Sequence, residues 1–372
     1  MVNINWEDLF GQENVKILLT KIIESGKIPH AFLFHGIEGC GKDFAALKFA
    51  ENLSLKYSEN YYFNINKIRQ ISEPYIKYIM PLPRGKNELE SNNALEKLTE
   101  DDIQTIQEEL KKKSNNPYYK ITIPKANVIK VNSIRDIKIF ISLNFSDVKY
   151  RFIIISEAHL MNEEAQNSLL KSLEEPPDGI IFILTTPFPG HLKETIRSRC
   201  WEINFSPLSN SEIRRVLINF FEIDDDLATK IAPFSNGSVQ NALKLYENDF
   251  EELIEKTISF LRYSFGNKLN SAYSHLVPYL SEKNSESFKF LIQLTIMWFN
   301  DLQKYRVGNN DIYFTSHKET LLKFNSKFPN VELVDIITKL DNMHSLIDRN
   351  VSLNTIAINL ILSVESLTAE FI

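Results

Sequence analysis

A glycine-rich turn between a short apolar run and a helical segment constrains the fold of this chain more than any other feature. Residues 31–35 are AFLFH, typical of a short buried strand, and residues 36–42 are GIEGCGK. Glycines let the backbone fold tightly enough for its amide hydrogens to converge on a phosphate. The helix expected over 44–55 adds its positive end, and Lys42 adds a point charge. An α/β domain with a phosphate-binding loop is therefore predicted. Its expected site residues are Gly36, Gly39, Gly41 and Lys42.

A second stretch, residues 151–177, indicates further parts of the same sheet. Its apolar run at 152–155 is short enough for a strand buried on both faces, and the sequence turns polar at Ser156-Glu157. Ligands of open parallel sheets bind at the carboxyl ends of the strands, so an acid at this position points into the expected site. Apolar residues then recur at helical spacing until two prolines end the helix. Further strands are expected at 180–184 and 201–205.

Composition narrows the class of protein. A chain of 372 residues with 43% hydrophobic and 24% charged residues is typical of a globular protein of two or three domains. Its net charge of -6 gives no basic surface of the kind that drives autonomous nucleic-acid binding, so protein partners are favoured. The two cysteines, Cys40 and Cys200, lie far apart without a CxxC motif, which argues against a disulfide framework and a zinc site. No signal peptide or bilayer-spanning run is recognised, which predicts a cytoplasmic protein without membrane contacts.

The stretch 151–177, together with SRC at 198–200, resembles the span from the Walker B strand to the arginine finger in AAA+ subunits of bacterial clamp loaders, above all those of the delta-prime type. The similarity runs, with one gap, from about residue 10 to about residue 245. It implies an AAA+ P-loop domain with a parallel sheet, followed by a small helical lid and an all-α collar that joins subunits. The implied ranges are 1–206 for the AAA+ domain with an insertion at about 56–115, 207–248 for the lid and 249–372 for the collar.

Two positions that hold magnesium in the active members of this family carry other residues here. The position after the loop lysine has Asp43 instead of Ser or Thr, and like charges about 4 Å apart cost roughly 1 kcal/mol in water and more at lower dielectric. Alternatively, Asp43 only stabilises the first turn of its helix through the dipole. Ser156 replaces the metal-holding Asp, whereas Glu157, the residue that orients the attacking water, is kept. Without hydrolysis, Glu157 is expected to serve as a helix-terminus acid.

Three further positions follow from the resemblance. Thr186 is the candidate for the strand-tip residue that senses the γ-phosphate, with a hydrogen-bonded core threonine as the open alternative. In the lid motif at 237–243, Gln240 replaces an arginine and cannot supply its charge or its fork of donors. Arg199 corresponds to the arginine finger that stabilises charge on a neighbouring subunit's ATP. Its alternative is a surface ion pair worth at most about 1 kcal/mol, and Arg197 is the less favoured finger.

The predicted insertion at about 56–115 departs from the family, several members of which carry a four-cysteine zinc module there. This chain has no cysteine in that range, so no zinc is expected. The run Lys111-Lys112-Lys113 could contact a nucleic-acid backbone, but interspersed acids favour a solvated face. The role of the insertion is left open.

Taken with the resemblance, these features predict a non-hydrolysing subunit of the DNA polymerase III clamp loader, itself a component of the DNA-directed DNA polymerase holoenzyme. ATP binding is expected to be weak or absent, with no cofactor required. The implied partners are the gamma/tau ATPase subunits, the delta subunit and, indirectly, the sliding clamp and primed DNA. The alternative is an active AAA+ ATPase, either a gamma/tau-type subunit or another remodelling motor. Such an enzyme would carry Ser or Thr, Asp and Arg in place of Asp43, Ser156 and Gln240.

Overall fold

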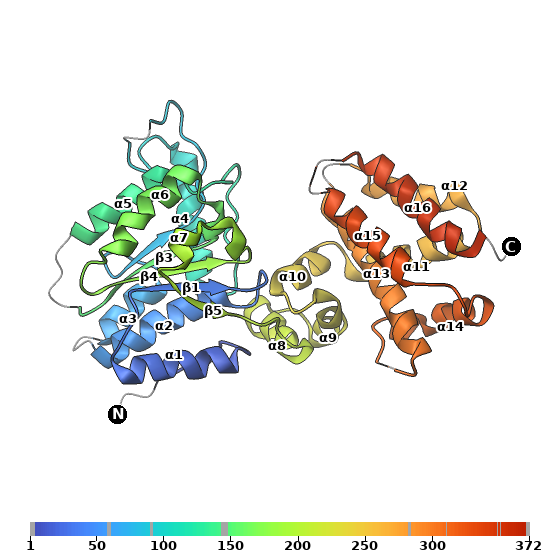
Figure 1. The fold of residues 1–372 in the computed structure, drawn as a ribbon, viewed down its shortest axis with the longest axis horizontal. Coiled ribbons are helices and arrows are strands. Elements are labelled where there is room, and N and C mark those ends of the chain that lie inside the picture. The colour runs from blue at the N-terminus through green and yellow to red at the C-terminus, as the bar shows by residue number, and fades with distance from the viewer. Residues whose placement is uncertain are drawn as a thin grey trace. The chain divides into compact units, whose positions relative to one another are not determined.

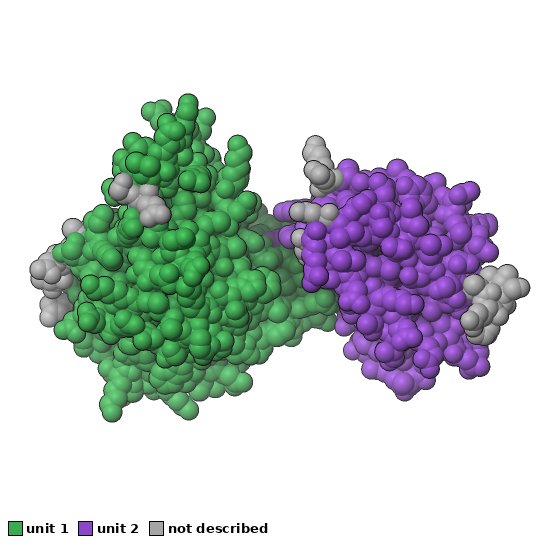
Figure 2. All heavy atoms as spheres, turned by 45° about the horizontal axis from the view of Figure 1, so that its top comes forward, with its two compact units in different colours: residues 1–241 green, residues 242–372 purple. Residues whose placement is uncertain are grey.

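The chain forms two compact units, unit 1 (residues 1–241) and unit 2 (residues 242–372), coloured separately in Figure 2. The structure is a computed structural model that describes residues 4–57, 61–89, 92–142, 148–281, 284–309, 311–347, 349 and 351–369. Unit 1 contains the sheet, and the described part of unit 2 consists of helices and connecting turns. The finer division predicted from the sequence, with a lid that ends at residue 248, stays a prediction.

A five-stranded parallel sheet forms the centre of unit 1, in the order β2-β3-β4-β1-β5. Its strands are β1 (Ala31–His35), β2 (Ile76–Ile79), β3 (Arg151–Ile155), β4 (Ile180–Thr186) and β5 (Trp201–Asn204). His35 at the end of β1 is in register with Thr186 of β4, and Leu184 of β4 with Ile155 of β3. The loops after β1, β3 and β4 therefore emerge at one edge of the sheet. The four strands expected from the sequence are present, and β2 was not expected.

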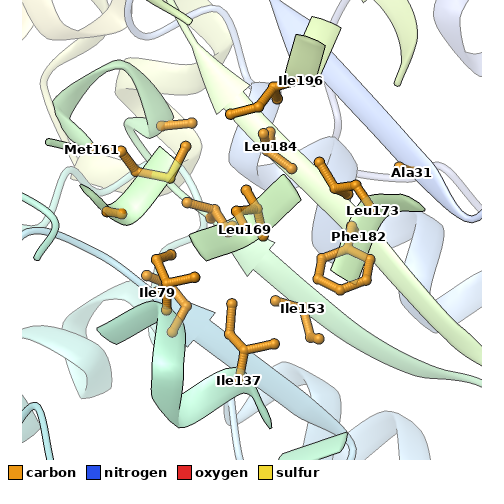
Figure 3. Packing of buried hydrophobic residues seen from close by; sticks show 14 of the residues in the cluster. Ala31, Ile79, Ile137, Ile153, Met161, Leu169, Leu173, Phe182, Leu184 and Ile196 are labelled. Carbon is orange, nitrogen blue, oxygen red and sulfur yellow. The ribbon is translucent and has the colours of Figure 1, made fainter. Parts of the chain in front are cut away.

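Helices cover both faces of the sheet (Figure 1). On one face lie α1 (Glu13–Ser25) and α2 (Lys42–Tyr57), and on the other α5 (Val131–Ser142) and α6 (Glu163–Glu174). Each inner strand has to be apolar on both sides, and all seven residues of β4 are buried. Figure 3 shows the core on the second face, where Ile153 and Phe182 of the sheet pack with Leu169 of α6. On the first face, the ring of Phe32 lies 5.1 Å from the ring of Phe49.

The predicted insertion contributes directly to unit 1. It contains α3 (Tyr61–Arg69), the edge strand β2 and α4 (Glu100–Asn115), whereas residues 58–60 and 90–91 lie outside the described residues. A capping box at Thr99 and Asp102 begins α4. Ile106 of α4 belongs to a small apolar cluster with residues that follow β2, among them Met80 and Leu82. The helix is therefore anchored beside the edge of the sheet.

Shorter helices complete unit 1, and longer ones form unit 2. The former are α7 (Glu194–Arg197), α8 (Asn210–Phe221), α9 (Asp225–Ile231) and α10 (Val239–Glu247), which crosses the boundary between the units. The latter are α11 (Phe250–Phe265), α12 (Leu269–Leu276), α13 (Ser285–Arg306), α14 (Lys318–Lys327), α15 (Val334–Ile347) and α16 (Leu353–Ala369). Aromatic rings make the core of unit 2, with those of Phe265 and Phe324 4.3 Å apart beside the buried Trp298. Among the described helices, none combines the length and the apolar character needed to cross a bilayer.

Candidate functional site

The loop after β1 borders a cavity of about 510 Å³ at the carboxyl edge of the sheet. Three glycines give this loop its tight shape, with φ angles of 147° at Gly36, 72° at Gly39 and 94° at Gly41. A Cβ atom on Gly39 would lie 2.7 Å from the backbone nitrogen of Gln240, so only glycine allows the loop to pack against the start of α10. The predicted site residues that line the cavity are Gly39, Gly41, Lys42, Asp43, Ser156, Glu157, Thr186 and Gln240.

The loop lysine is engaged by its own loop. The Nζ atom of Lys42 donates hydrogen bonds to the carbonyl oxygens of Gly36 at 2.8 Å and Ile37 at 2.6 Å, and the residue is 8% exposed. A phosphate would have to compete with both carbonyls for this ammonium group. The loop has the predicted shape, but its cation already has acceptors.

Asp43 lies in the first turn of α2, as expected, and is also the centre of a hydrogen-bonded cluster. The hydroxyls of Tyr78 and Ser156 donate to its Oδ2 atom at 2.9 Å and 2.8 Å, and the hydroxyl of Thr185 donates to Oδ1 at 2.6 Å. The Nζ atom of Lys113 lies 3.4 Å from Oδ2. One carboxylate thus links the start of α2 to β2, to the residue that follows β3, to β4 and to α4. These contacts go well beyond a favourable interaction with the helix dipole.

This environment keeps Asp43 ionised. Burial by itself would raise the pKa of the carboxyl, but the charge of Lys113 and the three hydroxyl donors outweigh burial and lower the pKa. Burial lowers the pKa of Lys113, and Asp43 opposes that shift. Burial and the charge of Asp43 raise the pKa of Tyr78 well above its usual value, so the phenol remains protonated and can donate.

The lowered pKa of Asp43 predicts a pH-dependent contribution to stability. Because the folded pKa lies below the unfolded value of about 4, this contribution is complete above about pH 4 and is lost as the pH falls through the folded pKa. The variant Asp43→Asn has no such group. The difference in unfolding free energy between the parent chain and Asp43→Asn should therefore shrink as the pH falls from about 4 toward about 3 in urea titrations. A difference that stays constant over this range would contradict the assignment.

The lysine run at 111–113 does not form a uniformly solvated face, and for Lys113 that prediction was wrong. The side chain of Lys113 is 5% exposed, whereas that of Lys112 is 56% exposed and pairs with Glu109 at 2.7 Å. The signal was available in the sequence, because residues 106, 109 and 113 follow one another at helical spacing and Ile106 is apolar. The charges alone, without this periodicity, predict a solvated Lys113, whereas the structure places its side chain on the buried side of α4.

Glu157 lies at a helix terminus but does not cap it with its side chain, so a role as a helix-terminus acid stays a prediction. It precedes the short 3-10 turn at Ala158–Leu160 with a φ of 52°, and its side chain makes no capping hydrogen bond. Instead, its Oε1 atom lies 3.3 Å from Nζ of Lys120, which also pairs with Glu38. Burial raises the pKa of Glu157 above its usual value, and the nearby charge of Lys120 only partly opposes this increase. Lys120 is a member of the site that sequence reasoning missed.

Thr186 and Gln240 are likewise engaged by groups of the chain itself. The hydroxyl oxygen of Thr186 accepts a hydrogen bond from the backbone N–H of Phe188 at 2.9 Å, and the residue is fully buried. Its neighbour Thr185 is the threonine that contacts Asp43. The Nε2 atom of Gln240 donates to the carbonyl of Tyr118 at 3.2 Å. A sensing role for Thr186 stays a prediction.

Arg199 lies between α7 and β5 and is not among the residues that line the cavity. Its Nη1 atom donates to the carbonyl of Thr195 at 2.8 Å, and its Nη2 atom lies 2.9 Å from Oε1 of Glu174. The side chain is 34% exposed. Arg197 pairs with Glu202 at 2.9 Å. Both arginines form surface ion pairs in this chain, and a role of Arg199 toward a neighbouring subunit stays a prediction.

The residues at the expected magnesium position do not fit that ion. Active P-loop enzymes hold magnesium through a hydroxyl after the loop lysine and a carboxylate at the strand end. Here the carboxylate is at Asp43 and the hydroxyl at Ser156, and the oxygens of Asp43 accept hydrogen bonds while facing the ammonium of Lys113. Within the described parts of the chain, no group of three or more His, Cys, Asp or Glu residues is placed to hold a metal ion.

A parallel sheet in this order, with a glycine-rich loop after β1 and helical segments after β5, defines a P-loop protein of the AAA+ class. Residues 11–126 and 112–209 match the model of the family described as DNA polymerase III, delta subunit. The chain belongs to that family of clamp-loader subunits.

Curated relatives are subunits of the same polymerase. The chain is 28% identical to DNA polymerase III subunit tau of Bacillus subtilis over 65% of its own length and 37% of the relative's length. It is 28% identical to subunit gamma of Buchnera aphidicola over 66% of its own length and 58% of the relative's. It is 26% identical to subunit delta' of Bacillus subtilis over 92% of its own length and 94% of the relative's. Of these three, only the delta' relative aligns over nearly the whole of both chains.

Solved structures show more distant similarity. A gamma subunit-related protein of Thermotoga maritima is 16% identical and has a TM-score of 0.41, with 94% of this chain and 99% of that protein covered. A Holliday junction branch migration motor from the same organism is also 16% identical with a TM-score of 0.41, over 88% of this chain and 91% of the motor.

Proposed function

We propose that this chain is a non-hydrolysing subunit of the DNA polymerase III clamp loader in the cytoplasm. It assembles with gamma/tau ATPase subunits and the delta subunit, and supports ATP-dependent loading of the sliding clamp onto primed DNA. The observation that most supports the proposal is that side chains of this chain surround Asp43 at the position expected for magnesium. The carboxylate of Asp43 takes hydrogen bonds from three hydroxyls and lies 3.4 Å from Lys113, so groups of the chain fill the place of the ion.

The charge balance of the cavity supports weak or absent nucleotide binding. Three lysines line it, and each already has oxygen acceptors: Lys42 has two loop carbonyls, Lys113 has Asp43, and Lys120 has Glu38 and Glu157. A triphosphate would have to displace these acceptors and approach an ionised Asp43. Repulsion between like charges about 4 Å apart is about 1 kcal/mol in water and about 4 kcal/mol at the effective dielectric near a protein surface.

The proposed contribution of this subunit to hydrolysis is Arg199. An arginine finger acts on a neighbour's ATP and needs no nucleotide in its own subunit. Arg199 suits this role because its guanidinium is partly exposed and lies apart from the chain's own cavity. The competing function, an active AAA+ ATPase, would require Lys42 to leave both carbonyls and Asp43 to leave its four partners before a metal–nucleotide complex could bind.

The isolated chain should show neither ATP turnover nor stabilisation by ATP. A ligand that binds the folded state stabilises it by RT ln(1 + [L]/Kd), so a ligand present at about 100 times Kd would add about 2.7 kcal/mol. We therefore expect the melting temperature of the purified chain to be unchanged by millimolar ATP and magnesium. A gamma/tau-type subunit, measured in parallel, is the positive control. Magnesium-dependent hydrolysis by this chain alone would establish the competing function instead.

A further inference from the structure

The environment of Lys113 is that of a bound cation. Its Nζ atom lies 2.7 Å from the carbonyl oxygen of Tyr119, 2.9 Å from that of Pro117 and 3.4 Å from Oδ2 of Asp43. An ammonium group carries three N–H donors, and here three oxygen atoms surround it. The side chain is 5% exposed, so solvent contributes little to its charge balance.

The carboxylate that faces Lys113 is shared by the elements around the cavity. The hydroxyls of Tyr78 and Ser156 donate to Oδ2 of Asp43, the same oxygen that Lys113 approaches, and Thr185 donates to Oδ1. A compact positive charge surrounded by carboxylate and carbonyl oxygens is the arrangement that proteins also use for hard metal ions. Removing the positive charge would leave a buried carboxylate with neutral donors alone.

We propose that Lys113 is the built-in cation of this site. It supplies the positive charge that the magnesium ion supplies in an active P-loop protein, so the start of α2 and the ends of β3 and β4 stay together without a ligand. The other two cavity lysines do not take this place, because Lys42 bonds to loop carbonyls and Lys120 pairs with Glu38 and Glu157.

The segment at 56–115 takes part in this site. This segment supplies β2, which carries Tyr78, and α4, which carries Lys113, and both residues contact Asp43. The segment predicted to be an insertion therefore provides two of the groups that contact Asp43. The inference rests on the proposed loss of magnesium chemistry in this site and does not depend on Arg199.

Chemical rescue of Lys113→Ala tests the proposal. Truncation removes the charge and leaves room for a small amine, so the melting temperature should fall by on the order of 10 °C. Propylammonium chloride should restore several degrees of this loss in the variant and leave the parent chain unchanged. Tetramethylammonium chloride at the same concentration is the control for ionic strength, because its cation is bulky and has no N–H donors to give to the three oxygens.

Matched variants separate the charge from general damage to α4. Lys112→Ala removes the adjacent, exposed lysine and should shift the melting temperature by no more than about 2 °C. If Lys113→Ala does not fold, Lys113→Met keeps the packing volume and removes the charge. Adding Asp43→Asn to Lys113→Met should then recover most of the lost stability.

Two results would overturn the proposal: equal melting temperatures for the alanine variants at 112 and 113, or equal rescue by tetramethylammonium and propylammonium. Binding of ATP is measured separately on the parent chain, so failure of the proposed function is distinguishable from failure of this inference. A parent chain that binds and hydrolyses ATP with magnesium refutes the proposed function, and a Lys113→Ala variant without amine rescue refutes the inference about Lys113.

Discussion

Arg199→Ala should reduce ATP hydrolysis at one site of the reconstituted clamp loader by on the order of 1,000-fold, because arginine fingers supplied in trans contribute about 10³–10⁵ in kcat. The effect should be confined to the neighbouring subunit that Arg199 faces. Single-turnover phosphate release is the suitable measurement, since the fast phase should lose the amplitude of one site while the other sites keep their rates. Assembly, followed by size-exclusion chromatography, should be unchanged because the side chain is partly exposed and its ion pair is on the surface.

Two companion variants make this test specific. Arg197→Ala removes a neighbouring arginine that pairs with Glu202, and it should leave phosphate release unchanged. Glu174→Gln removes the acidic partner of Arg199 but keeps the finger. Exposed pairs of this kind are worth about 0.2–1 kcal/mol, so the change should stay within about fivefold. A complex that assembles with Arg199→Ala and releases phosphate at the parental rate and amplitude would refute the finger.

Asp43→Thr should destabilise the chain by about 3–5 kcal/mol even though it restores the residue type of active family members. Threonine cannot balance the charge of Lys113, which is buried, and loss of one partner of a buried pair leaves an uncompensated charge. The three hydroxyls that donate to Asp43 lose their acceptor as well. The free energy of unfolding from urea titrations, monitored on unit 1, measures the loss.

A second substitution checks the cause of this loss. The Oγ atom of Ser156 lies 2.8 Å from Oδ2 of Asp43, so Ser156→Asp in the Asp43→Thr background places a carboxylate near Lys113 and should recover part of the stability. Neither variant should hydrolyse ATP, because Gln240 still lacks the charge of the lid arginine. If Asp43→Thr is as stable as the parent chain, the buried pair contributes nothing and the explanation fails.

Local patterns were sufficient for the sheet interior and for the glycine loop. The strands β1, β3 and β4 are short apolar runs between polar turns, which is the pattern of parallel strands covered on both faces. β2 has the sequence IKYI with only its two ends buried, so it carries no such run and was not expected. Glycines with positive φ were predictable from the loop motif because the backbone conformation depends on the residue type itself.

The sequence alone determined the class of fold, the family and the substitutions at positions 43, 156 and 240, because each of these depends on residue identity along a continuous motif. Only the tertiary structure decided what Asp43 contacts. Its partners Tyr78, Ser156 and Thr185 lie 35, 113 and 142 residues away in sequence. They lie next to the carboxylate because the order of the strands in the sheet brings them there. The ion pair with Lys113 likewise depends on where α4 packs, because Coulomb attraction and desolvation act through distance in space.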